Sequence, residues 1–207
     1  MHPYYLKTYL DIVPKNSRIL DLGCGNGDLL ATLKQHKQIK GYGVDKKKSY
    51  VLDCLKKGIS IYQGNIEEWL KEFSNQSFDI VILSQTLQQI ENPVHILNES
   101  LRVGKKVIIS FPNFAYWKLR FQLLLGKAPR SKSLPFTWYN TPNIRIISIY
   151  DFKELCQQES ITICKEHPLF ESKWARKCFK PFANLMSKKA LFVIQRSPTS
   201  WVLIISK

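Results

Sequence analysis

The sequence predicts an α/β fold of the Rossmann-like type, with a mostly parallel seven-stranded sheet and helices on both faces. Short apolar runs alternate with amphipathic helical patterns along most of the 207 residues, as in βαβ units. A glycine-rich turn at residues 23–27 joins the first of these runs to a helical pattern. The run Phe78–Leu83 is almost wholly apolar, which is typical of a central parallel strand buried on both faces.

The length allows one domain, and we expect residues 1–207 to form a single domain with additions. The additions are an N-terminal helix within residues 1–16, an insertion at 112–148 and a tail at 197–207. The N-terminal helix would cover the sheet edge or roof a ligand. Strands are expected at 18–22, 39–44, 59–63, 78–83, 104–110, 161–166 and 190–195, with an edge strand possible at 201–205. After the first helical pattern, helices are expected at 49–57, 92–102, 116–125 and 149–159, the last with Asp151 at or near its N-cap.

Composition indicates a soluble cytoplasmic protein without a metal site. No run is apolar enough to span a membrane, and the N-terminus lacks the layout of a signal peptide. The five cysteines are scattered without a Cys-x-x-Cys pair, which predicts reduced thiols. The net charge of +15 suggests polyanions, but 24 of the 31 basic residues are lysines spread along the chain. The charge is therefore weak evidence for a nucleic-acid partner.

The glycine-rich turn predicts a nucleotide-like ligand. Gly23, Gly25 and Gly27 stand at alternate positions, where tight backbone turns and close ligand approach favour glycine. The spacing differs from the Gly-x-Gly-x-x-Gly of dinucleotide-binding proteins, and Asp28 would repel a pyrophosphate. The pattern Asp-x-Gly-x-Gly-x-Gly, which starts at Asp21, resembles motif I of class I S-adenosylmethionine-dependent methyltransferases. Their ligand carries a cationic sulfonium.

The ends of the next strands supply further candidate ligands. Asp45 lies about 20 residues after the glycine turn, where a carboxylate suits a ribose diol. Asn65 stands where related methyltransferases carry an acid that accepts from adenine, and its amide oxygen could do the same. Glu67 is an alternative acceptor or a helix cap. The full set of expected cofactor-binding residues is Asp21, Gly23, Cys24, Gly25, Gly27, Asp45, Lys46, Asn65, Ile66, Ser84 and Gln85.

The insertion at 112–148 reads as a lid or a binding loop. Residues 130–143 are irregular and rich in aromatics, amides and prolines, as loops that close over ligands or dock partners often are. A plain surface loop held down by its aromatic residues is the alternative. Candidate substrate or partner residues are Asn113, Trp138, Tyr139, Asn143 and Arg145.

Six segments together resemble the methionine biosynthesis protein MetW family. Two are specific to it: Ser-Gln-Thr-Leu-Gln at 84–88 and Trp-Tyr-Asn-Thr-Pro-Asn-Ile at 138–144. The resemblance runs from about residue 17 to residue 196. The six segments are 18–27, 81–88, 102–104, 110–114, 134–144 and 151–156.

The resemblance implies a class I methyltransferase fold and a link to bacterial methionine synthesis. It implies S-adenosylmethionine or S-adenosylhomocysteine as cofactor and homoserine O-acyltransferase as the partner whose activity is supported. This chain has Ala115-Tyr116 where the family tends to have Gly-His, Arg145 where it tends to have His, and Asn65 where it has an acid. An acid–base role for those two family histidines is therefore absent here.

Three functions follow, in order of preference. The first is a cofactor-binding accessory protein of methionine synthesis. The second is a methyltransferase for a small molecule, which works mainly by positioning and therefore requires few titratable residues. The third is an RNA-modifying methyltransferase, suggested by the charge alone, because no RNA-binding module is visible.

Overall fold

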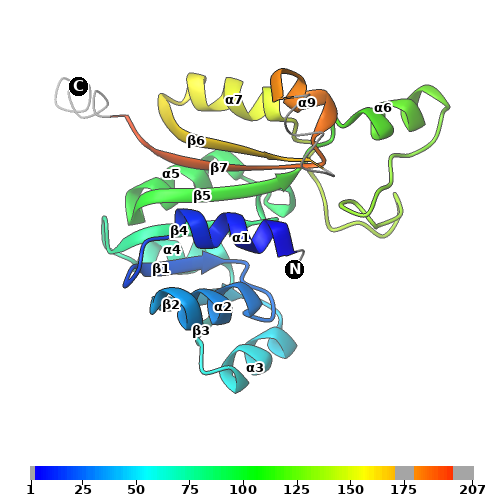
Figure 1. Ribbon diagram of the computed structural model, residues 1–207. Coiled ribbons are helices and arrows are strands. Elements are labelled where there is room, and N and C mark those ends of the chain that lie inside the picture. The colour runs from blue at the N-terminus through cyan, green and yellow to red at the C-terminus, as the bar shows by residue number, and fades with distance from the viewer. Residues whose placement is uncertain (1–2, 171–179, 198–207) are drawn as a thin grey trace. The chain divides into compact units, whose positions relative to one another are not determined.

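The computed structural model describes residues 3–170 and 180–197 (Figure 1). The edge strand expected at 201–205 and most of the basic aromatic stretch at 170–182 lie outside these ranges. The chain divides into two compact units. One comprises residues 1–84 and 92–108, and the other comprises residues 85–91 and 109–207.

The first unit alternates strands and helices as the sequence predicts. Four of its strands are joined by three parallel pairings. Asp21 at the end of β1 pairs with Gly43 on β2 and with Ile82 on β4. Asp45 at the end of β2 pairs with Gln63 on β3. The elements are α1 (Pro3–Ile12), β1 (Arg18–Leu22), α2 (Asp28–Lys37), β2 (Lys40–Asp45), α3 (Lys48–Lys56), β3 (Ser60–Gln63), α4 (Ile66–Glu72), β4 (Phe78–Ser84) and α5 (Pro93–Val103).

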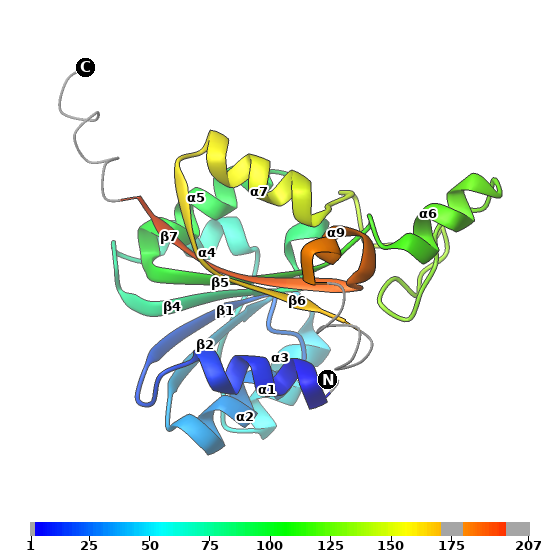
Figure 2. The ribbon, with the colours of Figure 1, turned by 45° about the horizontal axis from the view of Figure 1, so that its top comes forward.

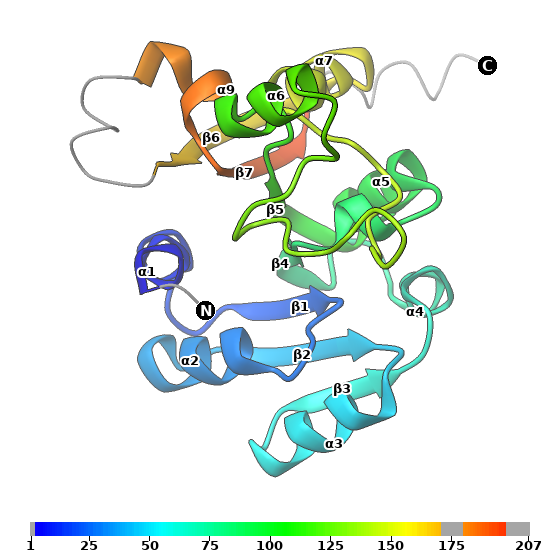
Figure 3. The same ribbon diagram turned by 90° about the vertical axis from the view of Figure 1, so that its right-hand side faces the viewer.

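Helices cover both faces of the strands of this unit. The arrowheads of β1, β2 and β3 point the same way, with α1 and α2 on one face and α4 and α5 on the other (Figure 3). The strands β1 and β4 are almost fully buried, as strands covered on both faces must be. The carboxyl ends of β1, β2, β3 and β4 therefore meet at one edge, where open α/β sheets bind their ligands.

Arg102 joins helix α5 to the end of helix α4 in the first unit. Its guanidinium makes a bidentate pair with Glu99, with Nη2 2.7 Å from Oε2, and donates to the backbone oxygens of Leu70 and Phe73 at 2.8 Å. It also donates to Asn75 Oδ1 at 2.9 Å. The planar fork of arginine suits this set of acceptors, and lysine could not reproduce it. The Arg-Val-Gly segment at 102–104 therefore has a structural role.

The second unit is built on a buried aromatic cluster. Its elements are η1 (Leu87–Gln89), the end of β5 (Gly104–Pro112), α6 (Trp117–Leu124), α7 (Ile149–Gln158), β6 (Ile161–Leu169), η2 (Lys180–Phe182), α9 (Ala183–Met186) and β7 (Lys189–Arg196). The rings of Phe111, Phe152 and Phe192 lie 4.8–5.9 Å apart, centroid to centroid, and join β5, α7 and β7. Strands β6 and β7 are antiparallel, and α7 packs on β6 (Figure 2).

The start of α7 gives Asp151 a defined role in a helix cap. The N-cap is Ser148, whose Oγ accepts from the backbone N–H of Asp151 at 3.1 Å. The Asp151 carboxylate accepts in return from the N–H of Ser148 at 3.1 Å. Asp151 is thus the N3 residue of a capping box, in the first turn and near the N-cap as expected, while the N-cap itself is Ser148.

Within residues 3–170 and 180–197, seven strands follow the order β3-β2-β1-β4-β5-β7-β6, with β6 and β7 antiparallel to each other. This confirms the predicted Rossmann-like α/β fold with a mostly parallel seven-stranded sheet. Within the described ranges, no helix is both long and apolar enough to cross a membrane.

Candidate site at the glycine turn

The glycine turn has the backbone geometry that its sequence demands. Gly23, Gly25 and Gly27 have φ values of 75°, 56° and 76°, in the left-handed region that side chains disfavour. The N–H groups of Gly23 and Cys24 both donate to Val44 O, at 2.8 and 3.2 Å, which ties the turn to the end of β2. Gly27 then serves as the N-cap of α2.

Two of the glycines in this region are required for different reasons. A Cβ built on Gly25 meets no atom within 4 Å, so this residue faces open space. A Cβ on Gly27 would lie 2.7 Å from Cys54 Sγ, so Gly27 is required by packing. Gly25 is thus the position where an added side chain would enter space available to a ligand.

The thiols of Cys24 and Cys54 fill the interior beneath the turn. Cys24 Sγ lies where a Cβ on Gly43 would clash, at 2.5 Å, and Cys54 Sγ lies 3.3 Å from Gly25 O. Burial raises the pKa of both thiols, so both remain protonated. A protonated, buried thiol is a poor nucleophile, so both cysteines serve the packing of the turn.

Asp45 holds the glycine turn through its carboxylate. Oδ2 accepts from the backbone N–H of Gly25 at 2.9 Å, and Oδ1 accepts from that of Lys47 at 2.9 Å. Each carboxylate oxygen keeps a second lone pair, so the side chain can still accept from a ligand. Lys46, which lies between Asp45 and Lys47 in the sequence, is exposed.

Asp21 is the buried acid of the site. Its side chain is 1% exposed, and Oδ1 has no hydrogen-bond partner in the described part of the chain. Burial, and secondarily the charge of Asp45, raises its pKa from the ordinary value of 3.8 to about 7. A buried polar atom without a partner usually marks a missing ligand or water.

The end of β3 supplies Asn65 and Ile66. Asn65 is exposed and caps α4, because its Oδ1 accepts from the N–H of Glu67 at 3.1 Å. This capping role was missed in the sequence, which instead offered Glu67 as a possible cap. Gly64 N donates to Asp45 O at 3.2 Å, so the turns after β2 and β3 are neighbours. Ile66, which begins α4, is half-buried.

The end of β4 contacts the N-terminal helix. Ser84 Oγ lies 3.3 Å from the hydroxyl of Tyr5, which itself lies 3.4 Å from the hydroxyl of Tyr9. Helix α1 thus reaches the carboxyl end of β4. Tyr5 is not among the site residues expected from the sequence.

In the second unit, Gln85 has a φ of 59°, an unusual conformation for a residue with a side chain. Its N–H donates to Ser110 O at 2.9 Å, and its carbonyl accepts from Gln88 Nε2 at 2.7 Å. Gln88 O then accepts from the N–H groups of Ile144 and Arg145, at 3.0 and 3.1 Å. The two family-specific segments are therefore bonded to each other.

The predicted substrate or partner residues divide into two kinds. Asn113 is fully buried, with Nδ2 donating to Asn184 O and Ser187 O at 2.8 and 2.9 Å and Oδ1 accepting from Ala115 N. It organises the chain and presents no surface to a partner. By contrast, Trp138, Tyr139 and Arg145 are exposed, and Asn143 is half-buried.

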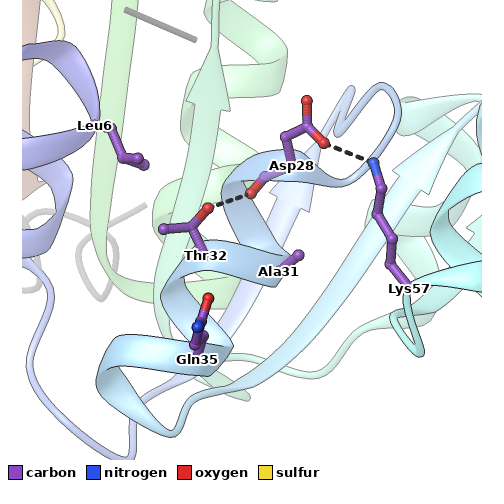
Figure 4. Close-up of a pocket in the computed structure, with 6 residues that line it drawn as sticks. All are labelled: Leu6, Asp28, Ala31, Thr32, Gln35 and Lys57. Atoms are coloured by element: carbon purple, nitrogen blue, oxygen red, sulfur yellow. Dashed lines mark hydrogen bonds and ion pairs between the residues drawn. The ribbon is translucent and has the colours of Figure 1, made fainter. Parts of the chain in front are cut away.

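A hollow of about 410 Å³ lies on the outer side of α2 (Figure 4). Asp28 and Lys57 form an ion pair at one side of it, with Lys57 Nζ 2.6 Å from Asp28 Oδ1. The hydrogen bond from Lys57 is the largest cause of the lowered pKa of Asp28. The remaining lining residues are Leu6, Ala31, Thr32 and Gln35. Gly25 is not among the residues that line this hollow.

The residues of the first unit fit a small cationic ligand with hydroxyl groups. Two acids, Asp21 and Asp45, stand at the ends of adjacent strands, and Asp21 has an unpaired buried oxygen. Gly25 leaves open space beside them. Such a set can accept from an ammonium or ribose hydroxyl and can balance a sulfonium charge, whereas it would repel phosphate. Fold and site together define a class I methyltransferase-like protein.

Comparisons with known proteins give the family. Residues 5–194 match the family described as Methionine biosynthesis protein MetW. Over 170 residues the chain is 39% identical to the bifunctional methionine biosynthesis protein MetXA/MetW of Rhodopirellula baltica, covering 77% of this chain and 27% of that protein. The chain thus spans about a quarter of that relative's length. We conclude that it belongs to the MetW family of methionine biosynthesis proteins.

Two further likenesses agree with the fold. The carboxy-S-adenosyl-L-methionine synthase of Campylobacter lari is 28% identical over 170 residues, which cover 68% of this chain and 71% of that one. A SAM-dependent methyltransferase from Archaeoglobus fulgidus superposes with a TM-score of 0.68 at 16% identity, covering 93% of this chain and 92% of that one. At that identity the likeness shows the fold alone.

Proposed function

We propose that the chain binds S-adenosylmethionine or S-adenosylhomocysteine at the glycine turn and supports homoserine O-acyltransferase in methionine biosynthesis. The observation that best supports this cofactor is the open space at Gly25, together with a buried oxygen of Asp21 that has no hydrogen-bond partner in the described part of the chain. Two printed names support it: the Campylobacter relative is a carboxy-S-adenosyl-L-methionine synthase, and the Archaeoglobus protein is a SAM-dependent methyltransferase.

In this proposal each part of the site has its own role. Asp45 holds the glycine turn through Gly25 and accepts from the ribose hydroxyls with its remaining lone pairs. Asp21 lies nearest the charge, where an ionised carboxylate would balance a cation. The turn after β3, with Asn65 and Ile66, borders the adenine.

The partner is proposed from the relative that joins MetXA and MetW in one polypeptide. We take its MetXA part to be homoserine O-acyltransferase, as the family resemblance implies. Joining two proteins in one chain holds them at an effective concentration near the millimolar range. A fusion of this kind suggests that its two parts act together. In an organism where the two proteins are separate chains, the MetW-family chain would bind the acyltransferase non-covalently.

Methyl transfer to a small molecule is the second candidate, and the insertion at 112–148 is the feature that could serve it as a lid. Trp138 and Tyr139 are, however, largely exposed, with their rings in contact only edge to face at 5.5 Å. A partner is preferred because the segment 138–144 is specific to the MetW family and a relative in that family is joined to MetXA in one polypeptide.

The test is an acyltransferase assay with purified homoserine O-acyltransferase from the same organism. We expect acyl transfer to rise when the chain is added, and the rise to depend on S-adenosylmethionine if the cofactor reports the end product of the pathway. An acyltransferase that works equally well without the chain, and that does not bind it, would contradict the proposal. Product analysis of the same mixtures for transferred methyl groups tests the second candidate.

A further inference from the structure

The insertion at 112–148 exposes an unusual amount of apolar surface. It holds ten of the seventeen large apolar side chains that are exposed in the described ranges. Helix α6 buries only Leu119, which packs with Tyr116 and Leu134. Phe121, Leu123 and Leu124 of the same helix are exposed, and Leu124 is 84% exposed. A surface helix normally buries its apolar stripe against the protein core. By contrast, α6 leaves several apolar side chains exposed to solvent.

The segment after α6 is folded back on it in a defined way. Gln122 Nε2 donates to Arg130 O at 3.0 Å, and Gln122 Oε1 accepts from Arg130 N at 2.6 Å. Residues Ser131 and Leu134 form a bridge through two backbone bonds of 3.0 Å. We call residues 117–136 the α6 hairpin. Figures 1 and 2 show the segment after α6 returning beneath that helix. Hydrogen bonds therefore hold the segment that carries the exposed apolar side chains in a defined conformation.

The charge of the insertion has one sign. Residues 112–148 contain six basic residues and no acidic one. Three arginines are aimed by bonds to backbone oxygens: Arg120 to Ala115 at 2.7 Å, Arg130 to Pro135 at 3.1 Å, and Arg145 to Glu91. A surface that is apolar at its centre and carries fixed guanidinium groups is complementary to an apolar groove with an acidic rim.

We infer that the α6 hairpin, with Trp138 beside it in sequence, is the surface that docks homoserine O-acyltransferase, and that Leu123 and Leu124 enter an apolar groove on that enzyme. The inference rests on the proposed function for the identity of the partner. A protein is favoured over a lipid surface because a relative of this chain is joined to MetXA in one polypeptide. Because the insertion carries guanidinium groups, the groove on the partner should be lined by aspartate or glutamate.

The experiment measures binding of the purified acyltransferase to the wild-type chain and to three variants. Leu123→Glu and Leu124→Glu place a carboxylate on the hairpin, where it would be desolvated and would face an acidic rim. Leu55→Glu on α3 is the matched control, because Leu55 and Leu123 are both 56% exposed. We expect the hairpin variants to bind at least about tenfold more weakly and the control to bind as the wild type does. Circular dichroism verifies that all variants are folded.

Each other outcome is decisive. A wild-type chain that does not bind the acyltransferase would overturn the proposed partner and this inference with it. Wild-type binding that survives both hairpin substitutions would overturn this inference and leave the proposed function standing. If Leu123→Glu instead dissolves a dimer of the chain, or releases it from vesicles of anionic phospholipid, while acyltransferase binding is unchanged, the surface serves a second copy or a membrane and the inference is wrong.

Discussion

The carboxylate of Asp45 accepts a hydrogen bond of 2.9 Å from the backbone N–H of Gly25, which links the end of β2 to the centre of the glycine turn. Both residues belong to the proposed cofactor site. In that proposal the acid shapes the turn and also accepts from the ligand. This double role changes what a substitution at position 45 is expected to do.

Asp45→Ala should weaken cofactor binding by about 1.5–3 kcal/mol, because a charged acceptor is lost from the ribose and the turn loses its anchor. That corresponds to roughly ten- to a hundredfold in affinity. Calorimetric titration with S-adenosylhomocysteine measures it. Asp53→Ala on α3, which loses only an exposed ion pair with Lys56, should bind normally. Equal affinity in the wild type and Asp45→Ala would make Asp45 a structural residue only.

Gly25→Ala and Gly126→Ala form a matched pair. The two glycines have φ values of 56° and 68°, and a Cβ on either meets nothing within 4 Å. Each substitution therefore costs about 1–2 kcal/mol of backbone strain. Only the Gly25 variant should lose cofactor affinity, and Gly25→Val should abolish binding. Thermal shifts with and without ligand separate the two effects. A similar loss of affinity at Gly126 would show that strain alone is responsible.

The raised pKa of Asp21 predicts a pH dependence of stability. The folded protein holds this proton up to about pH 7, whereas the unfolded chain releases it near pH 3.8. Within that window the native state binds more protons, so Asp21 makes the protein less stable as pH rises, by at most about 1.4 kcal/mol per pH unit. Above pH 7 its contribution is constant.

Asp21→Asn removes this titrating group while keeping the shape of the side chain. The free energy of unfolding is measured with denaturant at pH 5 and at pH 8. From pH 5 to pH 8 it should fall less, or rise more, in Asp21→Asn than in the wild type. Identical pH profiles would mean that the Asp21 carboxyl titrates near its ordinary value in the folded protein.

Asn113→Ala should destabilise the second unit. It leaves the backbone oxygens of Asn184 and Ser187 without their shared donor, at about 1–3 kcal/mol for each group left unpaired and buried. Asn140→Ala, at an exposed position in the insertion, should cost little. The melting temperatures measure the difference. If both variants melt with the wild type, the Asn113 bonds contribute nothing to stability.

The parts of the fold that local pattern determines were predictable. The apolar run at Phe78 and the alternate glycines led directly to β4 and to three positive φ values, because each depends on residues close in sequence. The helix at 149–159 was expected for the same reason. Its cap at Ser148 was missed, since Ser148 and Asp151 bond to each other and the sequence argument considered only the acid.

The residues that sequence reasoning missed or misplaced depend on long-range contacts. Tyr5 meets Ser84 across 79 positions, and Cys54 fills space beneath Gly27, so no local pattern reports either. Asn113 follows a strand and resembles a ligand residue in sequence. Its burial against α9 comes from chain more than 70 residues away. The cofactor roles of the predicted residues stay predictions.

Calorimetric titration of the purified wild-type chain with S-adenosylmethionine and S-adenosylhomocysteine tests the central claim most directly. We predict equimolar, saturable binding that Gly25→Val abolishes and Gly126→Ala preserves. The absence of heat and of any thermal shift with either ligand at millimolar concentration, in a folded wild-type protein, would contradict a cofactor site at the glycine turn.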